Sequence, residues 1–216
     1  NEDGVVENTD KMFASVGVGD KEYKLLAKVS DFTKDGWKLE ALRNENATLV
    51  PGGKLEKDAF LTNKDGRKIG VIIRNLSDKN QKVSDCIVTK LSFSKEMFDG
   101  QITLPGSLGF DSTEKELKAA GFKKDADGIY TYTSKKIKDD TIKAAMADGE
   151  SVSEFTLERA VDESSTSTGN AAANTSASTA AGSATTTASD SSSAEQNSVT
   201  ADTTLTNNCL LYTSDA

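Results

Sequence analysis

Residues 113–123 read TEKELKAAGFK, and this stretch decides the fold class that the sequence predicts. Thr113 and Glu116 have the spacing of a capping box, in which each side chain accepts a hydrogen bond from the other residue's backbone at the start of a helix. Gly121 can end that helix in the left-handed conformation, and the aromatic Phe122 then folds back onto the core. The sequence therefore predicts a short helix near Thr113–Ala120.

The same pattern occurs once more at residues 32–38, which read FTKDGWK. Both stretches consist of an apolar residue, three further residues, a glycine, an aromatic residue and a lysine. The first copy predicts a helix near Val29–Asp35 that ends at Gly36, and an apolar segment precedes each copy, at residues 23–26 and 102–104. We therefore expect an α+β fold built from two diverged units, each a short helix packed on antiparallel sheet.

Turn sequences divide the rest of this region into short strands. The strands show alternating apolar residues, which predict one buried face for each of three sets: Ile69, Val71 and Ile73; Ile87, Leu91 and Phe93; Ile142, Ala144 and Met146. Phe155 and Leu157 follow the third set after Asp148-Gly149, a dipeptide typical of tight hairpins. We expect a hairpin at this dipeptide.

The charges divide the chain into a folded module and two flanking segments. All 26 basic residues lie between Lys11 and Arg159, so the net charge of −8 comes from the ends. We expect an acidic flexible lead-in over residues 1–11 and a folded α+β module over 12–160, with possible lobes 12–98 and 99–160. Residues 161–208 are dominated by Ser, Thr and Ala, which offer little apolar surface. This composition predicts a disordered linker.

The last eight residues differ in composition from this linker. Residues 209–216 read CLLYTSDA and resemble the conceptual translation of a sequencing-adapter end, so we expect an artefact there and a natural chain that continues past Asn208. No segment of the sequence has the length and hydrophobicity of a signal peptide or a membrane span. We expect any signal peptide or lipobox to lie upstream of Asn1.

A longer set of motifs supports a resemblance to a known group of proteins. The set comprises ITLPG at 102–106, GFDSTE at 109–114, Leu117, Gly121-Phe122 and YTY at 130–132, together with residues 31–37 and the strand at 70–75 that leads to Asp85-Cys86. Over roughly residues 12–160 the chain resembles modules of poorly characterised surface lipoproteins from Gram-positive gut bacteria. It departs from their pattern where Gly121-Phe122-Lys123 replaces the usual Gly-x-Pro. More distantly, the helix-then-sheet units are similar to the fold of beta-lactamase-inhibitor proteins and outer-membrane assembly lipoproteins, which implies protein binding by analogy.

The residue inventory excludes several kinds of chemistry. The chain has no histidine, which excludes Ser-His-Asp and Cys-His catalysis and imidazole metal sites. Without Cys209, only Cys86 remains, and we expect it to be a buried small side chain rather than a reactive thiol. The glycines at 51–54 and 105–109 lack the spacing of a phosphate-binding loop. We expect no catalytic, cofactor-binding or metal-binding residues and no nucleic-acid binding by this neutral module.

Three local patterns leave an alternative open. Residues 1–10 resemble the later part of an EF-hand calcium loop, with Asn1, Asp3 and Asp10 at ligand positions, and the alternative is the acidic lead-in. Residues 125–129 begin like a calcium loop but read better as a turn. The aromatic residues Trp37, Tyr130 and Tyr132 could form a ligand-stacking platform, although Trp37 fits the core better. A pair of carboxylates acting as in glycoside hydrolysis also stays open.

We therefore expect a non-catalytic extracellular or cell-surface module, with a binding or structural role, carried on a flexible stalk. Its partner would be a protein or a glycan at the cell surface. One alternative is an accessory domain of a larger secreted enzyme that continues past residue 208. The other is an inhibitor-like protein-binding domain.

Overall fold

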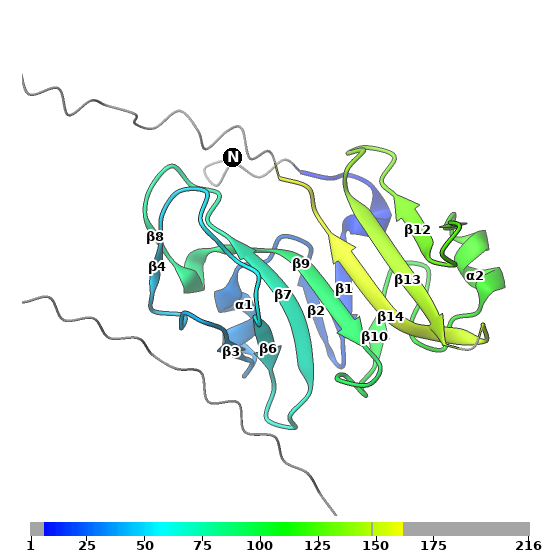
Figure 1. Cartoon of the computed structure of the whole chain (residues 1–216), viewed down its shortest axis with the longest axis horizontal. Helices are drawn as coiled ribbons and strands as arrows, with labels where there is room; N and C mark the ends of the chain where they lie inside the picture. The colour runs from blue at the N-terminus through cyan, green and yellow to red at the C-terminus, as the bar shows by residue number, and fades with distance from the viewer. Residues whose placement is uncertain (1–6, 148, 162–216) are drawn as a thin grey trace, which may run out of the picture. The chain divides into compact units, whose positions relative to one another are not determined.

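The structure, a computed structural model, describes residues 7–147 and 149–161. The predictions for residues 1–6, for the Ser/Thr/Ala-rich linker beyond residue 161 and for residues 209–216 lie outside the described residues. Figure 1 shows the described chain in colour. Its elements are η1 Lys11–Phe13, β1 Ser15–Val18, β2 Lys21–Lys24, α1 Val29–Lys34, β3 Lys38–Glu40, β4 Thr48–Leu49, β5 Lys54–Leu55, β6 Phe60–Thr62, β7 Lys68–Arg74, β8 Gln81–Lys82, η2 Val83–Asp85, β9 Ile87–Ser94, β10 Ile102–Thr103, α2 Glu114–Ala119, β11 Lys123–Lys124, β12 Tyr130–Thr133, β13 Thr141–Ala147 and β14 Ser151–Glu158.

One large antiparallel sheet runs through the described residues. Its strand order is β11-β12-β13-β14-β9-β7-β6-β3, and β5 pairs with β7 outside this order. We call residues 15–94 the first half and residues 102–158 the second half. The first half contributes β3, β6, β7 and β9 to this order, and the second half contributes β11 to β14. The last strands of the two halves, β9 and β14, pair at the centre with Phe93 opposite Phe155. The expected lobes 12–98 and 99–160 are thus joined by a continuous sheet.

The two helices lie where the sequence predicts them, so the expectation of two short helices with mostly antiparallel sheet is confirmed. In α2, the Thr113 side chain accepts a hydrogen bond from the Glu116 amide, and the Glu116 carboxylate accepts one from the Thr113 amide at 2.8 Å. Gly36 and Gly121 end the helices with φ of +91° and +100°. Such φ values favour glycine because it has no side chain to clash with the backbone.

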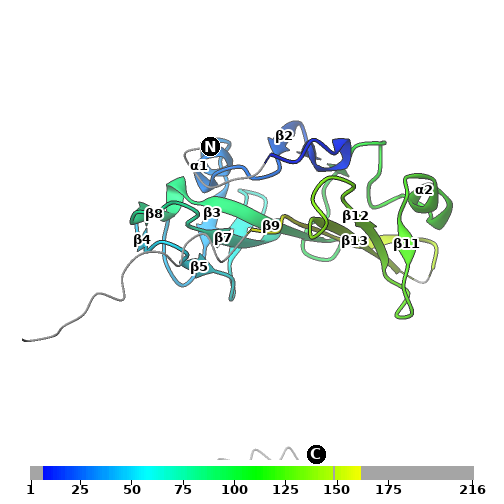
Figure 2. The same cartoon turned by 90° about the horizontal axis from the view of Figure 1, so that it is seen from above.

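The core lies between the large sheet and a layer of helices and strands on one of its sides (Figure 2). This layer includes α1 and a small sheet of order β10-β1-β2, which takes strands from both halves. Aromatic rings fill the space between the layers. Tyr23 stacks on Phe32 of α1 with 4.2 Å between ring centroids, and Phe93 meets Phe98 edge to face at 5.7 Å. Buried aromatic side chains therefore pack against one another in the space between the two layers.

The first half carries additional chain at two of its turns. Residues 41–59 separate β3 from β6, and residues 75–86 separate β7 from β9. The two segments pair with each other through β4 and β8, and the buried Asn75 amide donates to the carbonyl oxygen of Leu49 at 2.9 Å. They form a small extension at one end of the sheet.

The sequence analysis placed Ile87 on the same face of β9 as Leu91 and Phe93, and this prediction is wrong. Ile73 lies opposite Val88, whereas Val71 lies opposite Leu91, so β9 contains one extra residue, Thr89, relative to β7. Such a β-bulge reverses the alternation of side chains along the bulged strand. Val88 therefore shares the core face with Leu91 and Phe93, and Ile87 points to the other side. The predicted hairpin of β13 and β14 is confirmed by their pairing from Thr141–Glu158 to Ala147–Ser151.

The structure also differs from the expected flexible lead-in over residues 1–11. Asn8 is buried, and its side-chain amide donates to the Asp140 carboxylate at 2.6 Å. The Asp10 carboxylate accepts hydrogen bonds from the Tyr132 hydroxyl at 3.0 Å and from the Lys135 amide at 2.9 Å. Polar side chains near the start of the chain thus belong to the fold because they satisfy polar groups of the second half.

In the part of the chain that the structure describes, no helix is both long and apolar enough to span a membrane.

Candidate functional site

The side of the large sheet that faces away from the core carries mainly small and charged side chains. We call it the polar face, and its residues follow from strand register and alternation. They are Lys38, Glu40, Phe60, Thr62, Lys68, Gly70, Ile72, Lys90, Ser92, Ser94, Lys123, Thr131, Thr133, Thr141, Lys143, Ala145, Glu154, Thr156 and Glu158. All of them are exposed or half-buried. The polar face is therefore a broad surface that solvent or a partner can reach.

The two halves place the same side chains in the same register on this face. In the second half Lys123 pairs with Thr131, which pairs with Lys143. In the first half Lys38 pairs with Thr62, which pairs with Lys68. Each half thus presents a Lys-Thr-Lys row across three neighbouring strands.

The rows differ in how their charges are neutralised. The Lys68 ammonium in the first half lies 2.7 Å from the Glu40 carboxylate, and the next basic residue towards the turn, Arg67, lies 2.6 Å from Asp99. In the second half, neither Lys123 nor Lys143 forms an ion pair with any described residue. Equivalent positions therefore have different electrostatic surroundings.

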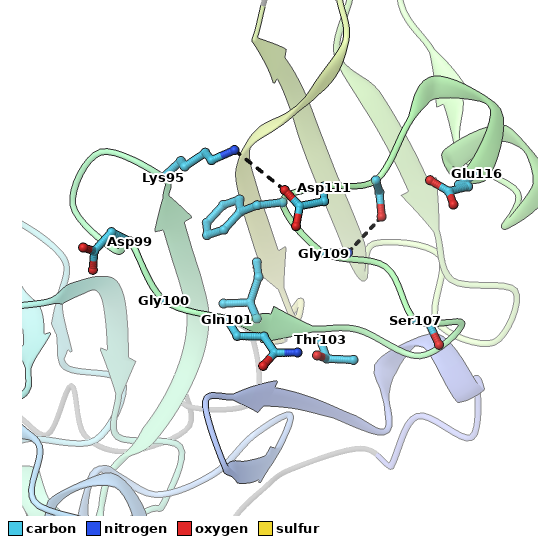
Figure 3. A pocket seen from close by; sticks show the side chains of 12 residues that line it. Lys95, Asp99, Gly100, Gln101, Thr103, Ser107, Gly109, Asp111 and Glu116 are labelled. Carbon is cyan, nitrogen blue, oxygen red and sulfur yellow. Dashed lines mark hydrogen bonds and ion pairs between the residues drawn. The ribbon is translucent and has the colours of Figure 1, made fainter.

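A second candidate is an open pocket of about 800 Å³ beside the segment that joins the halves (Figure 3). It is lined by Glu116 of α2 and by parts of residues 95–112, namely residues 95, 99–103, 107 and 109–112. Three carboxylates border it, those of Asp99, Asp111 and Glu116. Acid–base chemistry such as glycoside hydrolysis would need one of them to be protonated near neutral pH.

Structural contacts engage these carboxylates instead. The hydrogen bond from Arg67 lowers the pKa of Asp99, and the hydrogen bonds from the Thr113 amide and hydroxyl lower the pKa of Glu116. Asp111 is fully exposed, with Lys95 at 3.9 Å. A lowered pKa disfavours the protonated form that a general acid needs, so Asp99 and Glu116 are unsuited to that role.

The aromatic residues considered for a stacking platform are buried. Trp37 packs near Phe98, and its indole N–H donates to the Tyr23 hydroxyl at 3.1 Å. Tyr130 and Tyr132 lie on the core face of β12. The core interpretation of Trp37 is confirmed, and the three rings do not form a ligand platform.

The other predicted local features have structural roles. Cys86 is buried, its thiol donates to the Lys82 carbonyl oxygen at 3.2 Å, and burial raises the pKa of the thiol to about 11. Asp125 closes a turn, because its carboxylate accepts hydrogen bonds from the backbone of Asp127 and Ile129. Of the calcium-loop pattern at residues 1–10, Asn1 and Asp3 lie outside the described residues. The described part of the chain contains no group of three or more Cys, Asp or Glu side chains arranged to hold a metal ion.

A buried polar network escaped the sequence interpretation. The Asp140 carboxylate contacts the Arg159 guanidinium and accepts hydrogen bonds from the Asn8 side chain and from the Ala160 amide, the latter at 2.7 Å. Ser134 also bonds to Asn8, at 3.0 Å. The residues come from three distant parts of the chain, so no local pattern could have indicated their contact.

Comparisons of the chain with protein-family models, with curated proteins and with solved structures find no significant match.

Proposed function

We propose that this chain is a non-catalytic binding module whose binding surface is the polar face. The observation that carries the proposal is the composition of this face across the sheet centre. There, Thr156, Ser92 and Gly70 lie side by side on neighbouring strands. A surface of small side chains lets a partner approach the backbone, and charged side chains surround it.

The state of the pocket supports a non-catalytic role. A carboxylate-pair mechanism needs one acid with a raised pKa, whereas the pKa values of Asp99 and Glu116 are lowered by their hydrogen bonds. The chain also has no histidine to replace them. We therefore assign the pocket carboxylates to helix capping and surface ion pairs.

We also infer that the two halves are diverged copies of one unit. The helix-ending glycines are followed by an aromatic residue and a lysine in both, and three neighbouring strands of the large sheet repeat the Lys-Thr-Lys register in each half. The halves meet about an approximate twofold axis between Phe93 and Phe155. Under this inference, the α+β fold consists of two copies of one unit, each with a short helix and antiparallel strands.

The setting we propose is extracellular or cell-surface, with a protein or a glycan as partner. The support comes from the sequence: the resemblance to surface lipoprotein modules and the Ser/Thr/Ala-rich segment after residue 163, which has no Lys or Arg and whose composition suits a spacer. Under this proposal the polar face is the surface presented to the partner.

A binding experiment with the full chain tests the proposal. The labelled chain is incubated with intact Gram-positive bacteria and with their purified envelopes, and bound label is measured. Thr156→Arg places a long charged side chain at the centre of the polar face, and we expect it to reduce binding at least tenfold. The matched control is Ala119→Arg, on an exposed position of α2 away from this face.

Thermal unfolding of each variant verifies that the fold is retained. Equal binding by both arginine variants would contradict the polar face as the binding surface. The non-catalytic part is tested by incubation with chromogenic glycosides. Turnover that Asp111→Asn abolishes would overturn it.

A further inference from the structure

The second half concentrates unneutralised positive charge around its Lys-Thr-Lys row. The strands that carry Thr131 and Lys143 are joined by the loop of residues 134–140, which contains Lys135, Lys136 and Lys138. Thr133 and Thr141 form the last pair before this loop. We call these residues the basic patch: Lys123, Thr131, Thr133, Lys135, Lys136, Lys138, Thr141 and Lys143.

The lysines of the basic patch are exposed, and the Asp10 carboxylate, which accepts the hydrogen bond of the Lys135 amide, lies beside Lys135. None of the five forms an ion pair within residues 7–147 and 149–161. The loop has two acids of its own, but Asp140 is buried against Arg159, which leaves Asp139 as its exposed carboxylate. On a chain with a net charge of −8, this surface is therefore locally positive.

The equivalent region of the first half serves as an internal reference. Lys68 is paired with Glu40, and the corresponding turn is tight, with Arg67 bound to Asp65 and Asp99. Lys38, like Lys123, forms no ion pair within the described residues, so the two rows differ at Lys68, which is neutralised, and at the equivalent Lys143, which is not. Unpaired lysines repel one another across a sheet, so an anionic partner would stabilise the second half specifically.

The size and composition of the patch restrict the partner. Lys123 and Lys143 lie two strands apart, about 10 Å, and the patch extends roughly 20 Å along the hairpin, an area on the order of 200 Å². A standard protein interface buries about 800 Å² on each partner and relies on aromatic or arginine anchors. The patch has neither, which favours a narrow linear polyanion over a folded protein.

The donor groups narrow the chemistry further. Lysine ammonium groups bind phosphate oxygens as point charges, and threonine hydroxyls can donate hydrogen bonds to the same oxygens. The aromatic rings of β12, Tyr130 and Tyr132, are buried on the opposite face, so the patch has no stacking surface for bases. A phosphate chain without bases fits these groups.

We propose that the basic patch binds a linear phosphate polymer that carries no bases. The inference rests on the proposed binding role of the polar face and names the chemistry of one ligand for its second half. The polymer would lie along the β12–β13 hairpin, with its phosphates near the lysines and the threonine hydroxyls.

The test uses long-chain inorganic polyphosphate as the probe and the full chain at several salt concentrations. Lys123→Gln combined with Lys143→Gln should weaken binding about tenfold at 0.1 M salt and lower the slope of log K against log salt by about two. The matched control is Lys38→Gln combined with Lys68→Gln, which alters the equivalent row and should leave affinity within about twofold. Thermal unfolding of both variants verifies their folding.

The alternatives are separate arms of the same experiment. Polyglutamate or duplex DNA of equal charge should bind at least tenfold more weakly than polyphosphate, and equal binding would overturn the assignment to phosphate. Equal losses in the two double variants would overturn the assignment to the second half. If polyphosphate does not bind but Thr156→Arg still blocks envelope binding, this inference fails while the proposed function stands. If Thr156→Arg has no effect on envelope binding either, both fail.

Discussion

The two halves of the sheet share a scaffold and differ in their connections. The first half extends its outer turns, and residues 41–59 and 75–86 pair with each other through β4 and β8. The second half has short connections at the corresponding places but a long loop at residues 134–140, which binds both Asn8 and Arg159 through Asp140. The two halves thus share a strand register across three neighbouring strands and differ in the polar contacts at their turns.

The largest expected effect comes from the buried ion pair of the second half. Asp140→Asn leaves the Arg159 guanidinium buried without its carboxylate, and both side chains are almost completely inaccessible to solvent. We expect the free energy of unfolding to fall by about 3–5 kcal/mol, as measured by urea denaturation. Asp99→Asn removes an exposed pair of the first half and should have little effect. Similar losses in both variants would contradict the distinction between the halves.

The helix-ending glycines provide a sharper comparison at matched positions. A Cβ at Gly121 would lie 3.3 Å from the Tyr132 ring, whereas a Cβ at Gly36 would meet nothing within 4 Å. Both residues have positive φ. We expect Gly36→Ala to cost about 1 kcal/mol and Gly121→Ala about 2 kcal/mol in unfolding free energy. If Gly36→Ala lost more unfolding free energy than Gly121→Ala, the contact with the Tyr132 ring would be unimportant.

Removal of the helix cap of the second half should have a smaller effect. Thr113→Ala removes the hydroxyl that accepts the Glu116 amide hydrogen bond. We expect a loss of about 1 kcal/mol, detected as a lower midpoint of thermal unfolding. Thr33→Ala within α1 is the control and should stay within about 0.5 kcal/mol of the parent. An unchanged midpoint for Thr113→Ala would mean that tertiary packing alone holds α2.

The smallest expected effect concerns pH and the contact of Asp10 with the second half. Burial favours the protonated form of Asp10, but hydrogen bonds from Lys135, Met12 and Tyr132 outweigh it and lower the pKa below its usual 3.8. A carboxyl with a lowered pKa in the folded state stabilises the fold above its unfolded pKa, and this stabilisation is lost as the pH falls through the folded pKa.

Asp10→Asn should therefore flatten the dependence of the unfolding free energy on pH below about pH 4. Denaturation at pH 6 and at pH 2.5 measures this slope. Glu7→Gln is the control because Glu7 is exposed and close by in the sequence. If the slope is unchanged in Asp10→Asn, the hydrogen bonds of Asp10 stabilise its ionised and protonated forms equally.

The sequence predicted those features of the fold that depend on neighbouring residues. The capping box at Thr113 and the glycine at 121 act within a few residues, so the helix could be located from the chain alone. The hairpin of β13 and β14 is local as well. The central pairing of β9 with β14 was beyond such reasoning because it joins residues about 60 positions apart, and the register depends on which strands meet.

The candidate site was less accessible to prediction for a similar reason. Lys123, Thr131 and Lys143 each read as ordinary solvent-exposed strand residues, and only their register places them in one row. Asn8 seemed part of an acidic, flexible end because its neighbours are polar. Its burial depends on Asp140, more than a hundred residues away. A β-bulge such as that at Thr89 also leaves no clear trace in the alternation of apolar residues.

The Asp140 carboxylate brings residues from the beginning and from the end of the described chain to one point. The Asn8 side chain and the Ala160 amide bond to its two oxygens at 2.6 Å and 2.7 Å. A polypeptide whose ends meet in this way can be inserted into a loop of a host protein without forcing the flanking segments apart. It can also be circularly permuted by linking residue 160 to residue 8 and opening the chain at the turn of Asp127 and Gly128. A pulling force applied to the two flanking segments would act first on the contacts of Asp140. The strands of the sheet would lie outside the path of that force.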